Sequence, residues 1–170
     1  MTGPTLATER LVLRPPVAAD LDGFAELLGD EDSARYIGGV QSRHGAWRSL
    51  MAMAGSWSLL GYGMFSVLDR ATGRWIGRVG PWRPEGWPGN EIAYAVLPAA
   101  RGRGLAAEAV TASADWARDA LGWREVLHVI HPLNAPSQAL AARLGARNRG
   151  PVRLPAPFDT ETYQEWHRPL

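Results

Sequence analysis

Residues 91–109 read EIAYAVLPAARGRGLAAEA and combine a strand pattern, a glycine-rich turn and a helix pattern. The first seven residues have the composition of a β-strand, which Pro98 ends. A glycine-rich turn follows, and then an alanine-rich stretch without Gly or Pro before Gly122, which predicts a helix. The unpaired N–H groups of a helix start and the positive end of the helix dipole lie together at such a turn, and its two arginines suit phosphate oxygens. The sequence therefore predicts a binding site for a phosphorylated ligand.

Hydrophobic periodicity divides the whole chain into alternating strands and helices. Strands are predicted at 10–14, 64–68, 75–80, 91–97, 126–130, 147–154 and 162–169, and helices at 20–28, 44–59, 104–121 and 136–144. The strand–helix–strand unit over 91–130 should have parallel strands, because its crossover is a helix. With 170 residues and no internal repeat, we expect a single domain spanning residues 1–170.

The composition excludes several classes of function. A net charge of +1 argues against a nucleic-acid binder that works by bulk electrostatics. Cysteine is absent, which excludes a thiolate metal site and a thiol nucleophile, and the four histidines show no metal-ligand spacing with carboxylates. No segment approaches the roughly 18 apolar residues of a membrane span, and the N-terminus has no signal pattern. We therefore expect a cytoplasmic protein that binds no metal, nucleic acid or membrane.

Two kinds of phosphate-binding turn are compatible with the glycine-rich segment. The GxGxxA pattern at 102–107 fits dinucleotide-binding proteins, which place an acidic residue about 20 positions further on, at the end of the next strand. The next strand, 126–130, ends without one, and about 40 residues after it are too few for a second nucleotide-binding half. The turn also reads Arg-x-x-Gly-x-Ala over 101–106, and in this it resembles the pyrophosphate loop of the GNAT acyl-CoA N-acetyltransferases. The second interpretation fits better.

The resemblance to the GNAT family extends over nearly the whole chain. The predicted order β-α-α-β-β-β-α-β-α-β-β is that of the GNAT fold. The stretches TERLVLRP at 8–15 and PLNAPSQALAARLG at 132–145 also resemble the branch that contains the ribosomal-protein N-terminal acetyltransferases. The resemblance implies a single-domain α/β (α+β) GNAT fold, with a mixed sheet of about seven strands flanked by about four helices. The fourth and fifth strands of that sheet splay apart.

By this resemblance, acetyl-CoA is the co-substrate. Its pyrophosphate would be held, largely through backbone N–H groups, by Arg101, Gly102, Arg103, Gly104, Leu105 and Ala106. Its pantetheine arm would lie between the splayed strands, against the backbone of Ala95, Val96 and Leu97, and Asn134 would contact the cofactor. The residues alone also allow a purely structural role for each of these features. The glycine-rich turn would then only cap a helix, and the face of the strand would be tightly packed. Asn134 would be an ordinary N-cap.

The catalytic groups follow from the same resemblance. Glu91 stands where family members often carry a glutamate, and through water it would accept a proton from the attacking amine. The alternative is a solvated glutamate at a strand end. Ser137 would protonate the leaving thiolate, unless it only caps its helix, which lacks the tyrosine that many family members carry there. His128 is expected to be a core histidine, and His131 is a minor candidate for the base.

The sequence thus predicts an N-acetyltransferase that moves an acetyl group from acetyl-CoA to a primary amine by direct attack in a ternary complex. The acceptor is a protein N-terminus or a small amine such as an amino acid, a polyamine or an aminoglycoside. Trp82 is expected in the core, and Trp87 lies either there or in the acceptor pocket. The alternative functions are a non-catalytic acyl-CoA-binding sensor of the same fold and a dinucleotide-dependent oxidoreductase. A homodimer is left open.

Overall fold

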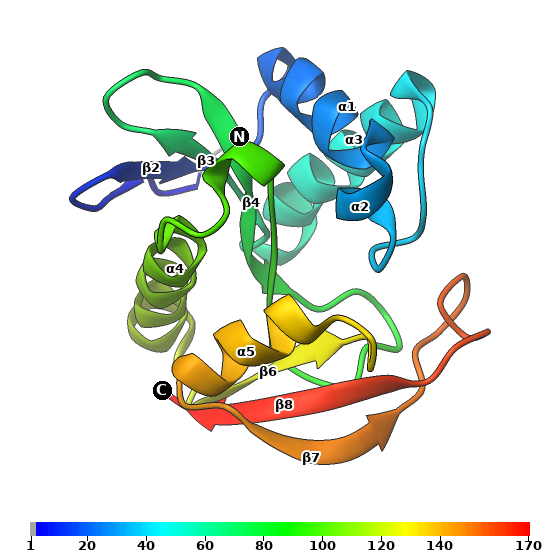
Figure 1. Ribbon diagram of the computed structural model, residues 1–170. Coiled ribbons are helices and arrows are strands. Elements are labelled where there is room, and N and C mark those ends of the chain that lie inside the picture. Colours follow the sequence, from blue (N-terminus) through cyan, green and yellow to red (C-terminus); the bar gives the residue numbers. More distant parts are fainter. Residues whose placement is uncertain (1–2) are drawn as a thin grey trace.

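The computed structural model describes residues 3–170, which build one mixed sheet of eight strands flanked by helices (Figure 1). The strands are β1 (Leu6–Ala7), β2 (Leu11–Arg14), β3 (Phe65–Asp69), β4 (Trp75–Trp82), β5 (Glu91–Val96), β6 (Glu125–Ile130), β7 (Arg147–Val152) and β8 (Tyr163–Pro169). The helices are α1 (Leu21–Gly29), α2 (Glu31–Ala34), α3 (Arg43–Leu60), α4 (Leu105–Leu121) and α5 (Ala135–Arg143), with short 3-10 turns at Ala18–Asp20 and Pro98–Ala100. The order of strands in the sheet is β1-β2-β3-β4-β5-β6-β8-β7.

This architecture confirms the predicted GNAT fold and adds two short elements to it. All seven predicted strands and all four predicted helices are present, with ends shifted by a few residues. The two-residue strand β1 pairs with β2 and extends the sheet to eight strands. Helix α2 forms in the segment after α1, because Asp30 accepts a hydrogen bond from the Ser33 N–H and caps it.

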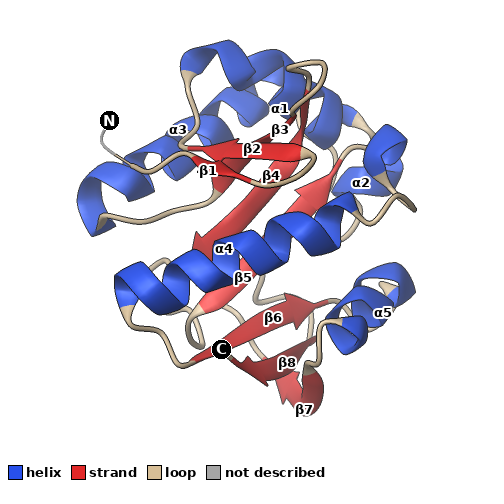
Figure 2. Cartoon of the chain, turned by 90° about the vertical axis from the view of Figure 1, so that its left-hand side faces the viewer, coloured by secondary structure: helices blue, strands red, loops and turns tan. Residues whose placement is uncertain are grey.

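The helices lie on both faces of the sheet (Figures 1 and 2). On one face α4 buries Leu105, Val110 and several alanines against β2, β3 and β4. The alanines are small and recur at helical spacing, so the helix can approach the sheet closely. On the other face α1 and α3 pack with Trp75 and Leu97 into a second apolar cluster. Among residues 3–170, no helix combines the length and the apolar character that crossing a bilayer requires.

The predicted splay lies between β5 and β6. These two strands are parallel, as the strand–helix–strand unit predicts, but a single residue pair, Glu91 with Leu127, joins them in register. In contrast, β4 pairs with β5 and β6 with β8 over six residue pairs each. Beyond Glu91, the edge of β5 that faces β6 therefore lacks ladder partners, and most of the predicted site residues lie around this opening.

Candidate active site

Two cavities adjoin on β5. The first, here called the loop cavity, has a volume of about 480 Å³ and lies between the 101–106 loop, β5 and the start of α5. The second, here called the sheet cavity, has a volume of about 250 Å³ and lies over β4 and β5, beside α3 and the 81–90 loop. Tyr36, Ile37, Tyr94 and Ala95 line both cavities. A ligand in one cavity can therefore meet a ligand in the other beside β5.

Most of the predicted cofactor-binding residues line the loop cavity. They come from three separate segments, β5, the glycine-rich loop and the start of α5, and they are Ala95, Val96, Arg101, Gly102, Gly104, Ala106 and Asn134. Ser137, the predicted proton donor, lines the same cavity. Asn134 caps α5 by accepting the N–H of Ser137 at 3.2 Å, so capping places its side chain at the cavity. The fold thus gathers into one cavity residues up to about 40 positions apart.

Three predicted residues lie outside the cavity lining. Leu97 is only 1% exposed, and its N–H and carbonyl already bond Ile76 and Ala100, so its backbone is not free to pair with a pantetheine arm. The side chain of Leu105 is buried in the core under α4. Arg103 contributes its carbonyl oxygen to a hydrogen bond with Arg10 at 2.9 Å. The expected role of Leu97 does not agree with these contacts, which give it a packing role instead.

The glycine-rich loop presents the start of α4 to the loop cavity. Gly102 and Gly104 have φ values of +70° and +76°, a left-handed conformation that favours glycine. Gly104 is the N-cap of α4 and offers no side-chain acceptor. The N–H groups of the first helical turn therefore lack partners within the helix and carry the positive end of its dipole. This is the arrangement of a phosphate site.

The N-terminal TERL stretch holds this loop in place. Glu108, in the first turn of α4, accepts hydrogen bonds from Thr8 and from the backbone N–H and Nε of Arg10, the latter two at 3.0 and 2.7 Å. Arg10 Nη1 also donates to the Arg103 carbonyl at 2.9 Å. The segment between β1 and β2 thus fixes the 101–106 loop from behind, which gives the resemblance at 8–15 a structural explanation.

Tyr94 is a site residue that the sequence interpretation missed. The Ser137 hydroxyl donates a hydrogen bond of 2.9 Å to the Tyr94 hydroxyl, which in turn donates to the Ser137 carbonyl at 3.1 Å. Burial raises the pKa of Tyr94 to about 12, so its hydroxyl stays protonated. Helix α5 lacks a tyrosine, but β5 supplies one beside Ser137. The available signal was the parallel β5–α4–β6 unit, which brings one face of β5 toward the start of α5.

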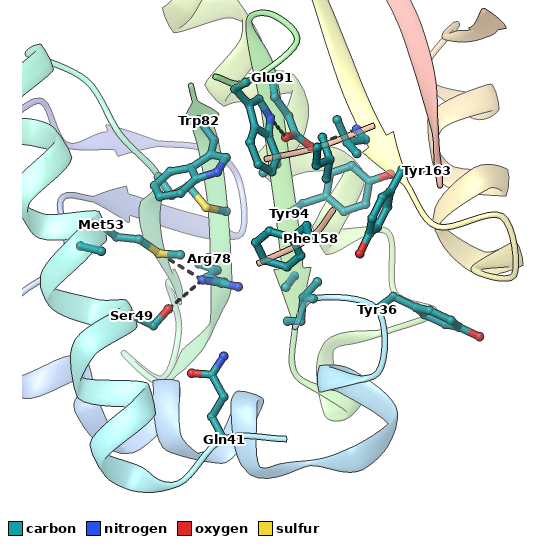
Figure 3. A pocket seen from close by; sticks show the side chains of 18 residues that line it. Tyr36, Gln41, Ser49, Met53, Arg78, Trp82, Glu91, Tyr94, Phe158 and Tyr163 are labelled. Atoms are coloured by element: carbon teal, nitrogen blue, oxygen red, sulfur yellow. Dashed lines mark hydrogen bonds between the residues drawn. The ribbon is translucent and has the colours of Figure 1, made fainter. Parts of the chain in front are cut away.

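Glu91 is buried, and the alternative of a solvated strand-end glutamate is wrong. Its side chain lines the sheet cavity and the residue is only 5% exposed (Figure 3). One carboxylate oxygen accepts from Trp87 Nε1 at 2.6 Å, and the other accepts the N–H of Val129 at 3.0 Å. This second bond bridges the splayed strands where the ladder is missing. Burial raises the pKa of Glu91 to about 7, although both hydrogen bonds act to lower it.

The remaining aromatic and histidine residues divide between core and cavity. Trp82 packs against the second apolar cluster, as expected for a core position, and both Trp82 and Trp87 also line the sheet cavity. His128 is buried as predicted, and burial lowers its pKa to about 4. Its Nδ1 lies 2.7 Å from the Ile92 carbonyl oxygen. His131 stacks on Tyr36 at 4.8 Å between ring centroids, outside the lining of the sheet cavity. Within residues 3–170, no group of acidic or histidine side chains is arranged to hold a metal ion.

Comparison with known proteins identifies the family. Residues 10–147 match the model of the acetyltransferase (GNAT) domain. An acetyltransferase from Agrobacterium tumefaciens str. C58 is 27% identical, with a TM-score of 0.86 over 99% of this chain and 95% of that one. A protein from Bordetella pertussis assigned to the GNAT-family acetyltransferases is 34% identical, with a TM-score of 0.79 over 97% and 99% of the two chains.

The fold is also shared with a more distant N-terminal acetyltransferase. The ribosomal L7/L12 α-N-protein acetyltransferase RimL, solved in complex with coenzyme A, is 15% identical, with a TM-score of 0.78 over 98% of both chains. At this identity the likeness shows the common fold alone. Together, the match over most of the chain and the 34% identical relative show that the chain belongs to the GNAT acetyltransferase family.

Proposed function

We propose that this protein transfers an acetyl group from acetyl-CoA to a primary amine by direct attack in a ternary complex. The observation that carries the proposal is the meeting of the two cavities at Tyr94 and Ala95. Ser137 faces the loop cavity, and Glu91 faces the sheet cavity. A proton donor and a proton acceptor thus stand on either side of the point where the two substrates would react.

The loop cavity fits a coenzyme A molecule. A Cβ on Gly102 would meet no heavy atom of the protein within 4 Å, so the loop leaves space in front of the start of α4. Its N–H groups would bind the pyrophosphate, with Arg101 beside it. The unpaired edge of β5 at Ala95 and Val96 would bind an extended pantetheine arm as an added strand. RimL, which has the same fold, was solved in complex with coenzyme A, and this supports coenzyme A as a ligand for the fold.

The protein residues would move two protons in the reaction. When bound, acetyl-CoA supplies the thioester carbonyl that the amine attacks. One Glu91 carboxylate oxygen accepts a proton from the amine through a water molecule, which its pKa of about 7 permits near neutral pH. The hydroxyl pair of Ser137 and Tyr94 would give a proton to the departing thiolate and would regain one from solvent. A C–N bond forms, a C–S bond breaks, and the thiol leaves uncharged.

Steady-state kinetics test the direct attack. The chain contains no cysteine, so no thiol of the protein can carry an acyl group between two half-reactions. We expect thiol release from acetyl-CoA to require both substrates. Double-reciprocal plots of the initial velocity should then give lines that intersect. Parallel lines would indicate an acyl-enzyme and would contradict the proposal.

Removal of the Ser137 and Tyr94 hydroxyls should lower kcat more than the affinity for acetyl-CoA. We expect the double variant Tyr94→Phe/Ser137→Ala to lose about 100-fold in kcat with little change in acetyl-CoA affinity, because general acids contribute about this much. Each single variant should lose less, because the other hydroxyl can still donate a proton. Tyr62→Phe is the matched control, because Tyr62 packs on Trp123 outside both cavities. A double variant with the kcat of the wild type would contradict these roles and would favour a cofactor-binding role for the pair.

A further inference from the structure

Arg78 is a buried arginine in the sheet cavity without an acidic partner. The residue lies on β4 and is only 8% exposed, and Figure 3 shows its guanidinium between α3 and the cavity. Nη1 donates to Ser49 Oγ at 3.2 Å and to Met53 Sδ at 3.3 Å. Nε is buried with no hydrogen-bond partner. Within residues 3–170, no carboxylate forms an ion pair with Arg78.

Burying the guanidinium of Arg78 in this way costs free energy of folding unless a ligand supplies a countercharge. Burial lowers the pKa of Arg78 to about 10, so the side chain is still charged at neutral pH. A buried charge whose partners are one hydroxyl and one thioether loses more hydration than these contacts return. An anionic group in the sheet cavity would supply the missing countercharge and the missing acceptors, and guanidinium matches a carboxylate in shape and charge.

The register of the sheet places Arg78 beside the reaction centre. Arg78 pairs directly with Ala95 across β4 and β5, and opposed residues of antiparallel strands project from the same face of a sheet. Ala95 lines both cavities. Glu91 projects from the same face of β5, because residues two and four positions apart do so. The anion-binding group therefore lies close to where the amine must stand, which favours an acceptor whose anionic group is close to its amine.

The rest of the sheet cavity is suited to an apolar side chain. Its walls include two methionines and four large aromatic residues, namely Met53, Met64, Trp82, Trp87, Phe158 and Tyr163. Apolar pockets of this kind bind a ligand by burying its hydrocarbon surface, while a few polar groups fix its orientation. The charged groups in this lining are Arg78 and Glu91, and uncharged polar atoms come from Gln41, Ser49 and the hydroxyls of Tyr36, Tyr94 and Tyr163.

We infer that the acceptor is a free α-amino acid with an apolar side chain. Its carboxylate pairs with Arg78, its amine faces Ala95 and Glu91, and its side chain lies among the aromatic walls. The inference rests on the proposed function and names the substrate class of the same site. It disfavours polyamines, which the buried guanidinium repels. It also disfavours a protein N-terminus, whose first carbonyl is an uncharged amide and leaves the guanidinium without a countercharge.

Matched acids and amides test the inference. Thiol release would be measured with L-leucine, L-methionine and L-phenylalanine, with their amides, and with peptides that begin with the same residues. We expect kcat/KM to be about 100-fold higher for the acids, because a partner lost from a buried charge pair costs about this much. In Arg78→Gln this preference should disappear, mainly through loss of activity on the acids. Arg83→Gln is the matched control, since Arg83 is exposed and outside the cavity lining, and it should keep the preference.

A binding measurement separates loss of recognition from loss of fold. Arg78→Met removes the buried charge and keeps an unbranched side chain, so we expect it to fold and to bind acetyl-CoA as the wild type does. Millimolar L-leucine should raise the melting temperature of the wild type and not that of Arg78→Met. Equal or better activity on amides or peptides, including peptides that begin with Asp or Glu, would overturn the inference and leave the acetyltransferase proposal standing. Absence of acetyl-CoA binding to the wild type would overturn both.

Discussion

Replacing Gly104 by glutamate is expected to abolish acetyl-CoA binding while leaving the fold intact. A Cβ at this position would lie 3.5 Å from its nearest neighbour, the Nη2 of Arg10, so the protein has room for it. The new carboxylate would stand at the start of α4, where the pyrophosphate is proposed to bind. Two unit charges about 4 Å apart, at an effective dielectric constant of about 20, repel by about 4 kcal/mol. The Kd measured by calorimetry should rise about a thousandfold.

Gly122→Glu is the matched control for this variant. Gly122 ends α4 with a φ of +70°, compared with +76° for Gly104, and a Cβ there would meet no heavy atom within 4 Å. The two substitutions therefore impose the same backbone strain and the same change of charge at opposite ends of one helix. We expect both to lower the melting temperature and only Gly104→Glu to lose acetyl-CoA. Equal Kd values for the two variants would contradict the placement of the pyrophosphate.

Glu91→Gln is expected to lower kcat by 100-fold or more, on the order of the usual contribution of a general base. Glutamine keeps the size of the side chain and can still accept one of the two hydrogen bonds that Trp87 and Val129 donate. It cannot take a proton from the amine. Acetyl-CoA affinity should change little, because Glu91 lines the sheet cavity and not the loop cavity. A kcat near that of the wild type would show that Glu91 only bridges the strands.

The pH dependence of this variant provides a second readout. In the wild type, kcat/KM should rise with pH through about 7, because the carboxylate must be ionised to accept a proton and burial raises its pKa to that value. In Glu91→Gln this rise should vanish, leaving only the ionisation of the amine. The free energy of unfolding should change with pH in the opposite direction to kcat/KM. The raised pKa of Glu91 adds to the free energy of unfolding. This contribution is complete below the ordinary pKa of a glutamate and is lost as pH rises through about 7. The melting temperature of Glu91→Gln relative to that of the wild type should therefore be higher at pH 8 than at pH 5.

The fold could be predicted because its signals are local. Gly104 and Gly122, both with positive φ, mark the two ends of the alanine-rich run that forms α4. The strand composition of 91–97 and the crossover length of 98–125 predict a parallel pair of strands. Helix α2 was missed because it is a single capped turn, and β1 because two residues carry no periodicity.

The glycine-rich loop at the start of α4 could also be predicted, whereas the surroundings of Glu91 and Arg78 could not. The loop is one continuous motif. Tyr94 and Ser137 are 43 positions apart, and only the packing of α5 beside β5 reveals their hydrogen bonds. Arg78 lies in a strand whose two faces are both covered, so its neighbours in the sequence give no sign that it borders a cavity. The burial of Glu91 likewise depends on Trp87 and on the splay of β6, two features that no local pattern encodes.

Calorimetric titration of the protein with acetyl-CoA, with NAD as a parallel ligand, distinguishes an acyl-CoA site from a dinucleotide site at the 101–106 loop. We expect saturable binding of acetyl-CoA and no heat from NAD, because the 101–106 loop and the unpaired edge of β5 suit a pyrophosphate followed by an extended arm. Binding of NAD without binding of acetyl-CoA would show that the loop serves a dinucleotide, and the proposed reaction would then be wrong.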